Sequence, residues 1–215
     1  MVQSKCTNKK KSSFLLEKRR IFEKYADYMP LVPDKVDFQL KYEHIGWVNI
    51  YILVNGEEKA FITASDVYEP FEDIKEWLEN IVKHRFDNIP SGVDIYDETD
   101  DNSLCFVPIP HIPNDQITDT ASGLCGIFYY YDGYEGKIVA DAMCDTEEFV
   151  KTTYKSILSF AKEMRDNDEF VEDWVEGAYN KEYGEMEDGD PRIKDIFINK
   201  VTSELLDEFL DNAKR

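Results

Sequence analysis

The spacing of apolar residues predicts a three-stranded meander over residues 36–64 of the chain. Apolar side chains fall on every second position of 36–42, as in a strand with one wet face. The next stretch, 47–54, is apolar at nearly every position, which is typical of a central strand or of one covered on both faces. Asn55-Gly56 then supplies the two positive φ angles of a type I′ turn into a third strand at 59–64.

Helical spacing of apolar residues returns in four other stretches. One helix is expected to begin near Ser12 or Ser13, after a basic flexible arm at 1–13, and another is expected over 69–86. Asp145 with Glu148 three residues later forms a capping box, which predicts a third helix start. Asp190-Pro191 opens a single closing helix, whose apolar stripe is Ile193, Phe197, Val201, Leu205, Phe209 and Leu210.

Further short strands complete the predicted sheet. They are expected at 93–96, 104–109, 124–131 and 137–143. Pro108, Pro110 and Pro113 predict an extended, unpaired loop, because proline cannot donate to a strand ladder. The order of elements predicts an α+β fold over 14–215, a single domain with an antiparallel sheet of about six or seven strands and helices mainly on one face.

Charge restricts the partners that this fold could bind. Forty-five acidic residues against twenty-five basic ones give a formal net charge of −20, whereas the first 25 residues are basic. Such a body repels nucleic acid and anionic membranes and attracts cationic surfaces. We therefore expect no direct contact with nucleic acid or membrane, and a basic protein as partner. With 42% hydrophobic residues, the chain can build a core.

The sequence predicts no catalytic residues, metal site or cofactor. Its four cysteines are widely spaced without a CxxC motif, and its three histidines lack metal-ligand spacing. No Walker A loop, GxGxxG motif or nucleophile elbow is present. Free thiols, the lack of a signal-peptide core and the lack of a long apolar run predict a cytoplasmic protein.

The strongest functional candidate is the acidic connecting segment 166–190. It holds eleven acidic residues and one lysine, interrupted by aromatic anchors at Phe170, Trp174 and Tyr179. Carboxylates can speed the encounter with a basic partner while an aromatic ring supplies affinity. The candidate partner-binding residues are Glu172, Asp173, Trp174, Glu176 and Tyr179. The alternative is a solvated linker whose aromatic residues only tether it to the sheet.

Residues 46–86 resemble part of a group of small acidic bacterial proteins that are uncharacterised. The likeness rests on the run Gly46–Ile52, the hairpin, and the sequence Ala64–Ile74 ahead of a helix that contains Trp77. Some members of that group accompany polymorphic toxins and are assigned as immunity proteins. The resemblance implies a cytosolic binding protein that blocks a partner, and it carries over no active-site residues.

Two functions follow as expectations. The first is a non-enzymatic, immunity-type inhibitor that masks a basic protein such as a nuclease toxin. The second is a hydrolase-like enzyme with a site near the proline loop 108–113, where His111 and neighbouring carboxylates would act as acid and base. A deep pocket holding His111 beside two carboxylates would favour the enzyme, and a shallow acidic face would favour the inhibitor.

Overall fold

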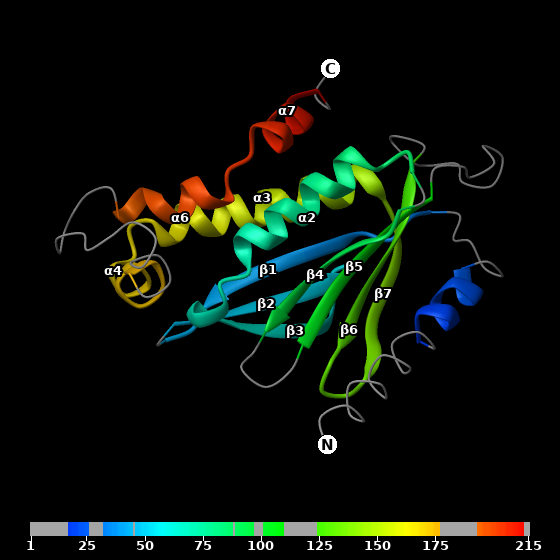
Figure 1. The fold of residues 1–215 in the computed structure, drawn as a ribbon, viewed down its shortest axis with the longest axis horizontal. Helices are drawn as coiled ribbons and strands as arrows, with labels where there is room; N and C mark the ends of the chain where they lie inside the picture. The colour runs from blue at the N-terminus through cyan, green and yellow to red at the C-terminus, as the bar shows by residue number, and fades with distance from the viewer. Residues whose placement is uncertain are drawn as a thin grey trace, which may run out of the picture.

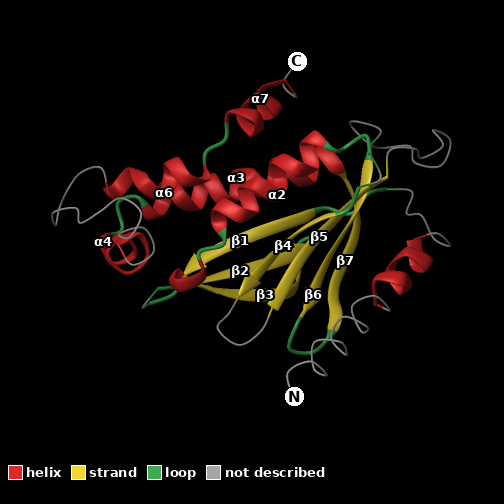
Figure 2. Cartoon of the chain, viewed as in Figure 1, coloured by secondary structure: helices red, strands yellow, loops and turns green. Residues whose placement is uncertain are grey.

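The computed structural model has an α+β fold built from two antiparallel sheets, one of three strands and one of four, with helices lying across both (Figure 1). Figure 2 shows the two sheets beneath helices α2 and α3, with α6 beyond the end of the strands. The structure describes residues 17–25, 32–44, 46–87, 89–96, 101–109, 124–176 and 193–212. The predicted fold class is confirmed at the level of α+β.

The three-stranded sheet is the predicted meander. Its strands are β1 (Val36–Tyr42), β2 (Trp47–Val54) and β3 (Glu57–Ser65), and β2 lies in the centre. Asn55 and Gly56 join β2 to β3 with φ angles of 55° and 80°, as the type I′ turn requires. One face of this sheet is buried in the core, as the alternation of β1 predicts.

The four-stranded sheet has the order β4-β5-β6-β7. Its strands are β4 (Ser91–Tyr96), β5 (Asp101–Ile109), β6 (Cys125–Asp132) and β7 (Lys137–Asp145). The expectation that Pro108 lies in an unpaired loop is wrong, because Pro108 pairs with Gly126 of β6. The last pair between β5 and β4 is Phe106 with Ser91, so β5 has a neighbour on one side only at Pro108. A missing N–H therefore removes no ladder bond there.

The expectation of one continuous sheet is also wrong. Among the described residues, one isolated parallel β-bridge joins the chain just before β1 to β7, between Asp34 and Cys144. There the Asp34 N–H donates to the Met143 carbonyl at 2.7 Å. Beyond this bridge β1 pairs with β2 and lies along a helix. The rings of Phe38 in β1 and Phe128 in β6 lie 5.7 Å apart, and a helix side chain packs against both of them.

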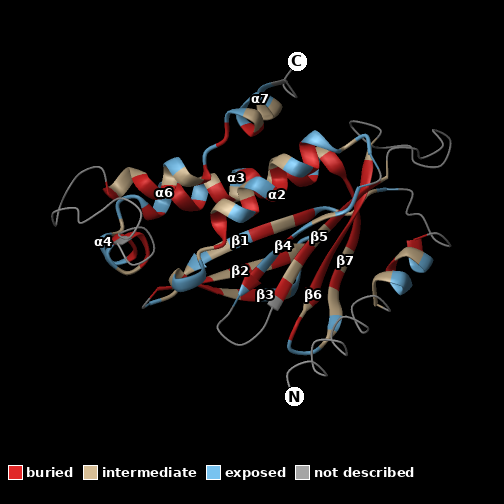
Figure 3. Cartoon of the chain, viewed as in Figure 1, coloured by how far each residue is buried: buried red, intermediate tan, exposed pale blue. Residues whose placement is uncertain are grey.

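That side chain is Phe149, at the start of α3 (Thr146–Met164). Its ring lies 6.1 Å from Phe38 of β1, 4.8 Å from Phe106 of β5 and 5.4 Å from Phe128 of β6, between ring centroids. Both sheets and both long helices thus contribute to one main core. Buried residues follow β6 and β7 along most of their length (Figure 3).

The two long helices start where the sequence predicts. α2 (Phe71–Lys83) begins after Pro70, and it buries its apolar stripe, which includes Trp77, in the main core. α3 is capped by Asp145, whose carboxylate accepts from the Glu148 N–H at 2.9 Å. A side chain at the N-cap satisfies an N–H that lacks a helical partner, which fixes the first turn.

The single closing helix is replaced by two, α6 (Ile193–Val201) and α7 (Glu204–Asn212). The chain turns at Ser203, whose N–H donates to the Tyr154 hydroxyl at 2.9 Å and whose hydroxyl donates to Glu79 at 2.8 Å. The bond to Tyr154 of α3 takes the place of the backbone hydrogen bond that the Ser203 N–H would make in a continuous helix. The apolar stripe continues through the break, so spacing alone does not reveal it.

A helix at residues 17–25 covers the outer face of the four-stranded sheet, opposite the main core. Ile21 and Tyr25 are buried, and the Tyr25 hydroxyl donates to Asp141 of β7 at 2.6 Å, beside an ion pair from Lys24. The other described helices pack on the main core, so helices lie mainly on one face as predicted, and this helix covers the opposite face. The sheet residues buried in this second core are Val107, Cys125, Ile127, Tyr129 and Met143. The predicted arm at 1–13 lies outside the described residues.

Within the described ranges, no helix combines the length and the apolarity needed to cross a membrane.

Candidate functional site

The first half of the predicted acidic segment folds as a short helical turn against the end of β1. α4 (Asp168–Phe170) starts at Asn167, whose side chain accepts from the Phe170 N–H, and it continues into the π-helical turn η2 (Val171–Glu176). Residues 177–192, which include Tyr179, lie outside the described part of the chain.

Two polar contacts join this turn to the end of β1. The Tyr42 hydroxyl at the end of β1 donates to the Asp173 carboxylate at 2.7 Å. His44, two residues further on, lies 2.7 Å from Glu169, measured from Nδ1 to Oε1. Burial and the bond to Asp173 raise the pKa of Tyr42 well above its usual value, and the Glu169 carboxylate raises the pKa of His44.

Trp174 holds the turn from the inside. Its side chain is 0% exposed, and its ring stacks on Phe170 at 5.8 Å and lies 5.6 Å from Phe71 of α2. The structure thus places this candidate residue in the core, where its ring is inaccessible to a partner. Its indole N–H has no hydrogen-bond partner among the described residues. Trp174 therefore joins the segment to helix α2.

Exposed carboxylates lie on the outside of the same turn. We define the acidic turn as residues 163–173, with exposed acids at Glu163, Asp166, Asp168, Glu169 and Glu172. Lys194 neutralises Asp168 at 3.0 Å, and His44 contacts Glu169. Among the described side chains, none with a positive charge forms an ion pair with the other three. The turn therefore presents three free carboxylates from a fixed backbone.

The five candidate residues are therefore only partly brought together. Glu172 is exposed, Asp173 is half-buried beside Tyr42, and Trp174 is in the core. The backbone of Glu176 ends η2, and its side chain lies outside the described part, as does Tyr179.

Sequence reasoning missed Tyr42 and His44 as parts of this site. Tyr42 fits the alternation of β1 as an ordinary inward-facing residue, and His44 is one isolated histidine. Their partners lie 131 and 125 positions away along the chain. The only signal in the sequence is that a tyrosine hydroxyl, such as that of Tyr42, needs an acceptor, and the segment 166–190 offers many carboxylates.

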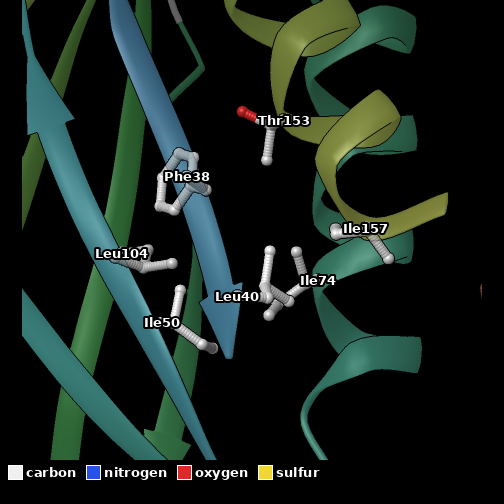
Figure 4. Close-up of a pocket in the computed structure, with 7 residues that line it drawn as sticks. All are labelled: Phe38, Leu40, Ile50, Ile74, Leu104, Thr153 and Ile157. Atoms are coloured by element: carbon white, nitrogen blue, oxygen red, sulfur yellow. The ribbon is translucent and has the colours of Figure 1, made fainter. Parts of the chain in front are cut away.

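A small cavity lies in the main core between β1, β2 and the two long helices (Figure 4). Its volume is about 10 Å³, the least that a single water molecule requires. The one polar group on its wall is the Thr153 hydroxyl, which already donates to the Phe149 carbonyl at 2.8 Å. This cavity is part of the packing of the core and offers no room for a substrate. Its walls are formed by Phe38, Leu40, Ile50, Ile74, Leu104, Thr153 and Ile157.

Residues that could serve catalysis are placed as follows. Burial raises the pKa of the Cys105 thiol to about 11 and that of Cys125 to about 12, so both are protonated at neutral pH. His84 contacts Asp87 at the end of α2, at 3.1 Å. The described residues contain no group of three or more His, Cys, Asp or Glu arranged to hold a metal ion. His111 and the proline loop beyond Ile109 lie outside them.

Comparisons with protein-family models, with curated proteins and with solved structures found no match to this chain.

Proposed function

We propose that this protein is a non-enzymatic binding protein that docks on a basic protein through the acidic turn and thereby masks it. The observation that carries the proposal is the rigid presentation of free carboxylates. Glu163 projects from the last turn of α3, Asp166 follows the end of α3, and Glu172 projects from the turn that Trp174 anchors in the core. A preorganised surface loses little conformational entropy on binding, so more of the interaction energy appears as affinity.

The charge of the whole molecule supports the same function. A net charge of −20 steers a cationic partner toward the protein and raises the association rate at low salt. The local carboxylates of the acidic turn then fix where the partner docks. The net charge of the molecule thus raises the association rate, and the acidic turn determines where the partner binds.

The partner that best fits this surface is a basic protein that itself binds nucleic acid, such as a nuclease toxin. Its groove is built to hold phosphates, and a fixed row of carboxylates can occupy it in their place. The role would be that of an immunity-type inhibitor, which the likeness of residues 46–86 also implies. Reduced thiols at Cys105, Cys125 and Cys144 agree with action in the cytoplasm.

The test begins with affinity capture from the source organism and with the product of the neighbouring gene. A single basic protein that stays bound at physiological salt is the expected result. Association with that protein is then measured for the variant Glu163→Gln/Asp166→Asn/Glu172→Gln. We expect its association rate to fall by about tenfold at low salt, with a flatter dependence on salt.

A matched control removes the same charge elsewhere. Glu57, Glu204 and Glu208 are exposed on the β2–β3 hairpin and on α7, and their change to Gln should lower the association rate much less. An equal loss in both variants would show that only global charge matters. The proposal is also overturned if only salt-labile, mixed background protein is captured.

A further inference from the structure

The outer face of the three-stranded sheet carries four large apolar residues that belong to neither hydrophobic core. Trp47, Tyr51, Leu53 and Phe61 are absent from both cores, although the inward residues of the same strands are buried. Phe61 is 55% exposed, and its ring lies 5.9 Å from that of Tyr51. A central strand that is apolar on both faces, with one face open, is typical of an interaction surface.

Strand register arranges this outer face in three rows that cross the sheet. The middle row is uncharged and mainly aromatic: Gln39, Tyr51 and Phe61. On one side of it lies a polar row, Lys41, Asn49 and Thr63, in which Lys41 also pairs with Glu43 at 2.7 Å. On the other side lies an acidic row, Asp37, Leu53 and Glu58. Along β1, the outward charges therefore read negative, neutral, positive.

This order is complementary to itself. A two-fold axis that runs along the middle row, between two such faces, places each middle row on its own copy. The same rotation places Asp37 of each copy opposite Lys41 of the other, twice in one interface. An isologous interface requires such self-complementarity, because residue i of one copy contacts residue j of the other while j contacts i. Charge complementarity thus favours a second copy of this chain as the occupant.

We propose that the outer face of the β1–β3 sheet pairs with the same face of a second copy to form a two-fold dimer. The aromatic residues Tyr51 and Phe61 form its dry centre, and the Asp37–Lys41 pairs set its register. Two sheets that pack in this way lie about 10 Å apart, the spacing of a β-sandwich. The acidic turn at the end of β1 is not part of this contact.

Sedimentation velocity over a wide range of concentration tests the dimer. We expect the wild-type chain to convert from monomer to dimer as its concentration rises. Asp37→Lys places lysine opposite Lys41, and Lys41→Asp places aspartate opposite Asp37, so each raises the dissociation constant by about tenfold or more. The double variant Asp37→Lys/Lys41→Asp again places opposite charges across the interface, with their signs exchanged, and should dimerise again.

Matched controls change charge by the same amount on helices α2 and α3. Glu76→Lys and Lys155→Asp are exposed there and should leave dimerisation unchanged. Circular dichroism checks that every variant is folded. A wild-type chain that stays monomeric at all concentrations overturns the proposal, whether the face is covered by another protein or by another segment. A folded double variant that fails to dimerise also overturns it. Neutralising the acidic turn should not affect the dimer, so this proposal and the proposed function fail separately.

Discussion

At the scale of single residues, the fold depends on aromatic rings that join elements far apart in sequence. Phe149 links both sheets, and Trp174 links the acidic turn to α2. The sequence identifies such residues as apolar but does not tell core from surface. Trp174 stands among carboxylates and was assigned to a partner, whereas its ring is buried in its own chain. Local polarity misleads here because the ring points inward from an acidic turn.

Trp174→Ala should lower the free energy of unfolding by about 3–5 kcal/mol, because it leaves a large cavity in a closed aromatic cluster. Trp174→Phe should cost less, since it keeps a ring and removes the buried N–H that has no partner in the described structure. Chemical denaturation followed by circular dichroism measures both. Glu172→Gln is the exposed control and should change stability by less than about 0.5 kcal/mol. A Trp174→Ala variant as stable as the control would contradict the burial.

Tyr154 should make stability fall at high pH. Burial raises its pKa to about 12 in the folded state, whereas tyrosine in the unfolded chain ionises near pH 10. Its contribution is therefore fully present below pH 10 and is lost between pH 10 and 12, by at most about 1.4 kcal/mol per pH unit. Other buried tyrosines add to this slope, so the measurement compares urea denaturation of wild type and Tyr154→Phe. Parallel pH curves for the two proteins would refute the assignment.

At the scale of elements, most helix starts and strands were predictable because their signals are local. Asn55-Gly56 determines the hairpin, and Asp145 caps α3 without help from distant residues. The break between α6 and α7 was not predictable, since Ser203 is held by Tyr154 from α3. The same holds for Pro108, which is tolerated only because β4 ends before it. Tertiary partners decide such boundaries.

The helix at 17–25 can be tested as a cover of the four-stranded sheet. Ile21→Asp places a carboxylate in the second core, so the helix should detach and expose Cys105, which packs against that core. We expect thiol alkylation of Cys105 to become several-fold faster, measured by mass spectrometry of labelled peptides. Arg19→Asp places the same carboxylate on the exposed side of the helix and should not alter the rate. No change for Ile21→Asp would mean that the helix does not protect the sheet.

At the scale of the whole molecule, the sequence determines charge and fold class but not the partition of strands between sheets. Seven strands were located, yet they divide into sheets of three and four strands that both contact the Phe149 ring. The candidate site was predictable in the same limited sense. Its carboxylates are visible as a run, whereas the contacts of Tyr42 and His44 join segments that no local pattern connects.

The charge of −20 predicts that salt stabilises the folded chain. Raising ionic strength from about 0.01 M to 0.15 M shortens the screening length from about 30 Å to 8 Å and weakens repulsion among carboxylates. The ion pairs lost in return are mostly exposed and contribute little. Thermal melts should therefore shift upward, equally in sodium and potassium chloride. A downward shift would show that attractive pairs dominate.

Docking of residues 17–25 on β7 has a consequence for synthesis on the ribosome. Tyr25 and its acceptor Asp141 are separated by 116 positions, so the helix is made long before its binding surface exists. At about 5–20 residues per second, the wait is roughly 6–23 s. During that time the apolar side of the helix has no native partner. The helix therefore reaches its native place only after β7 has been made, although its residues precede β7 in the chain.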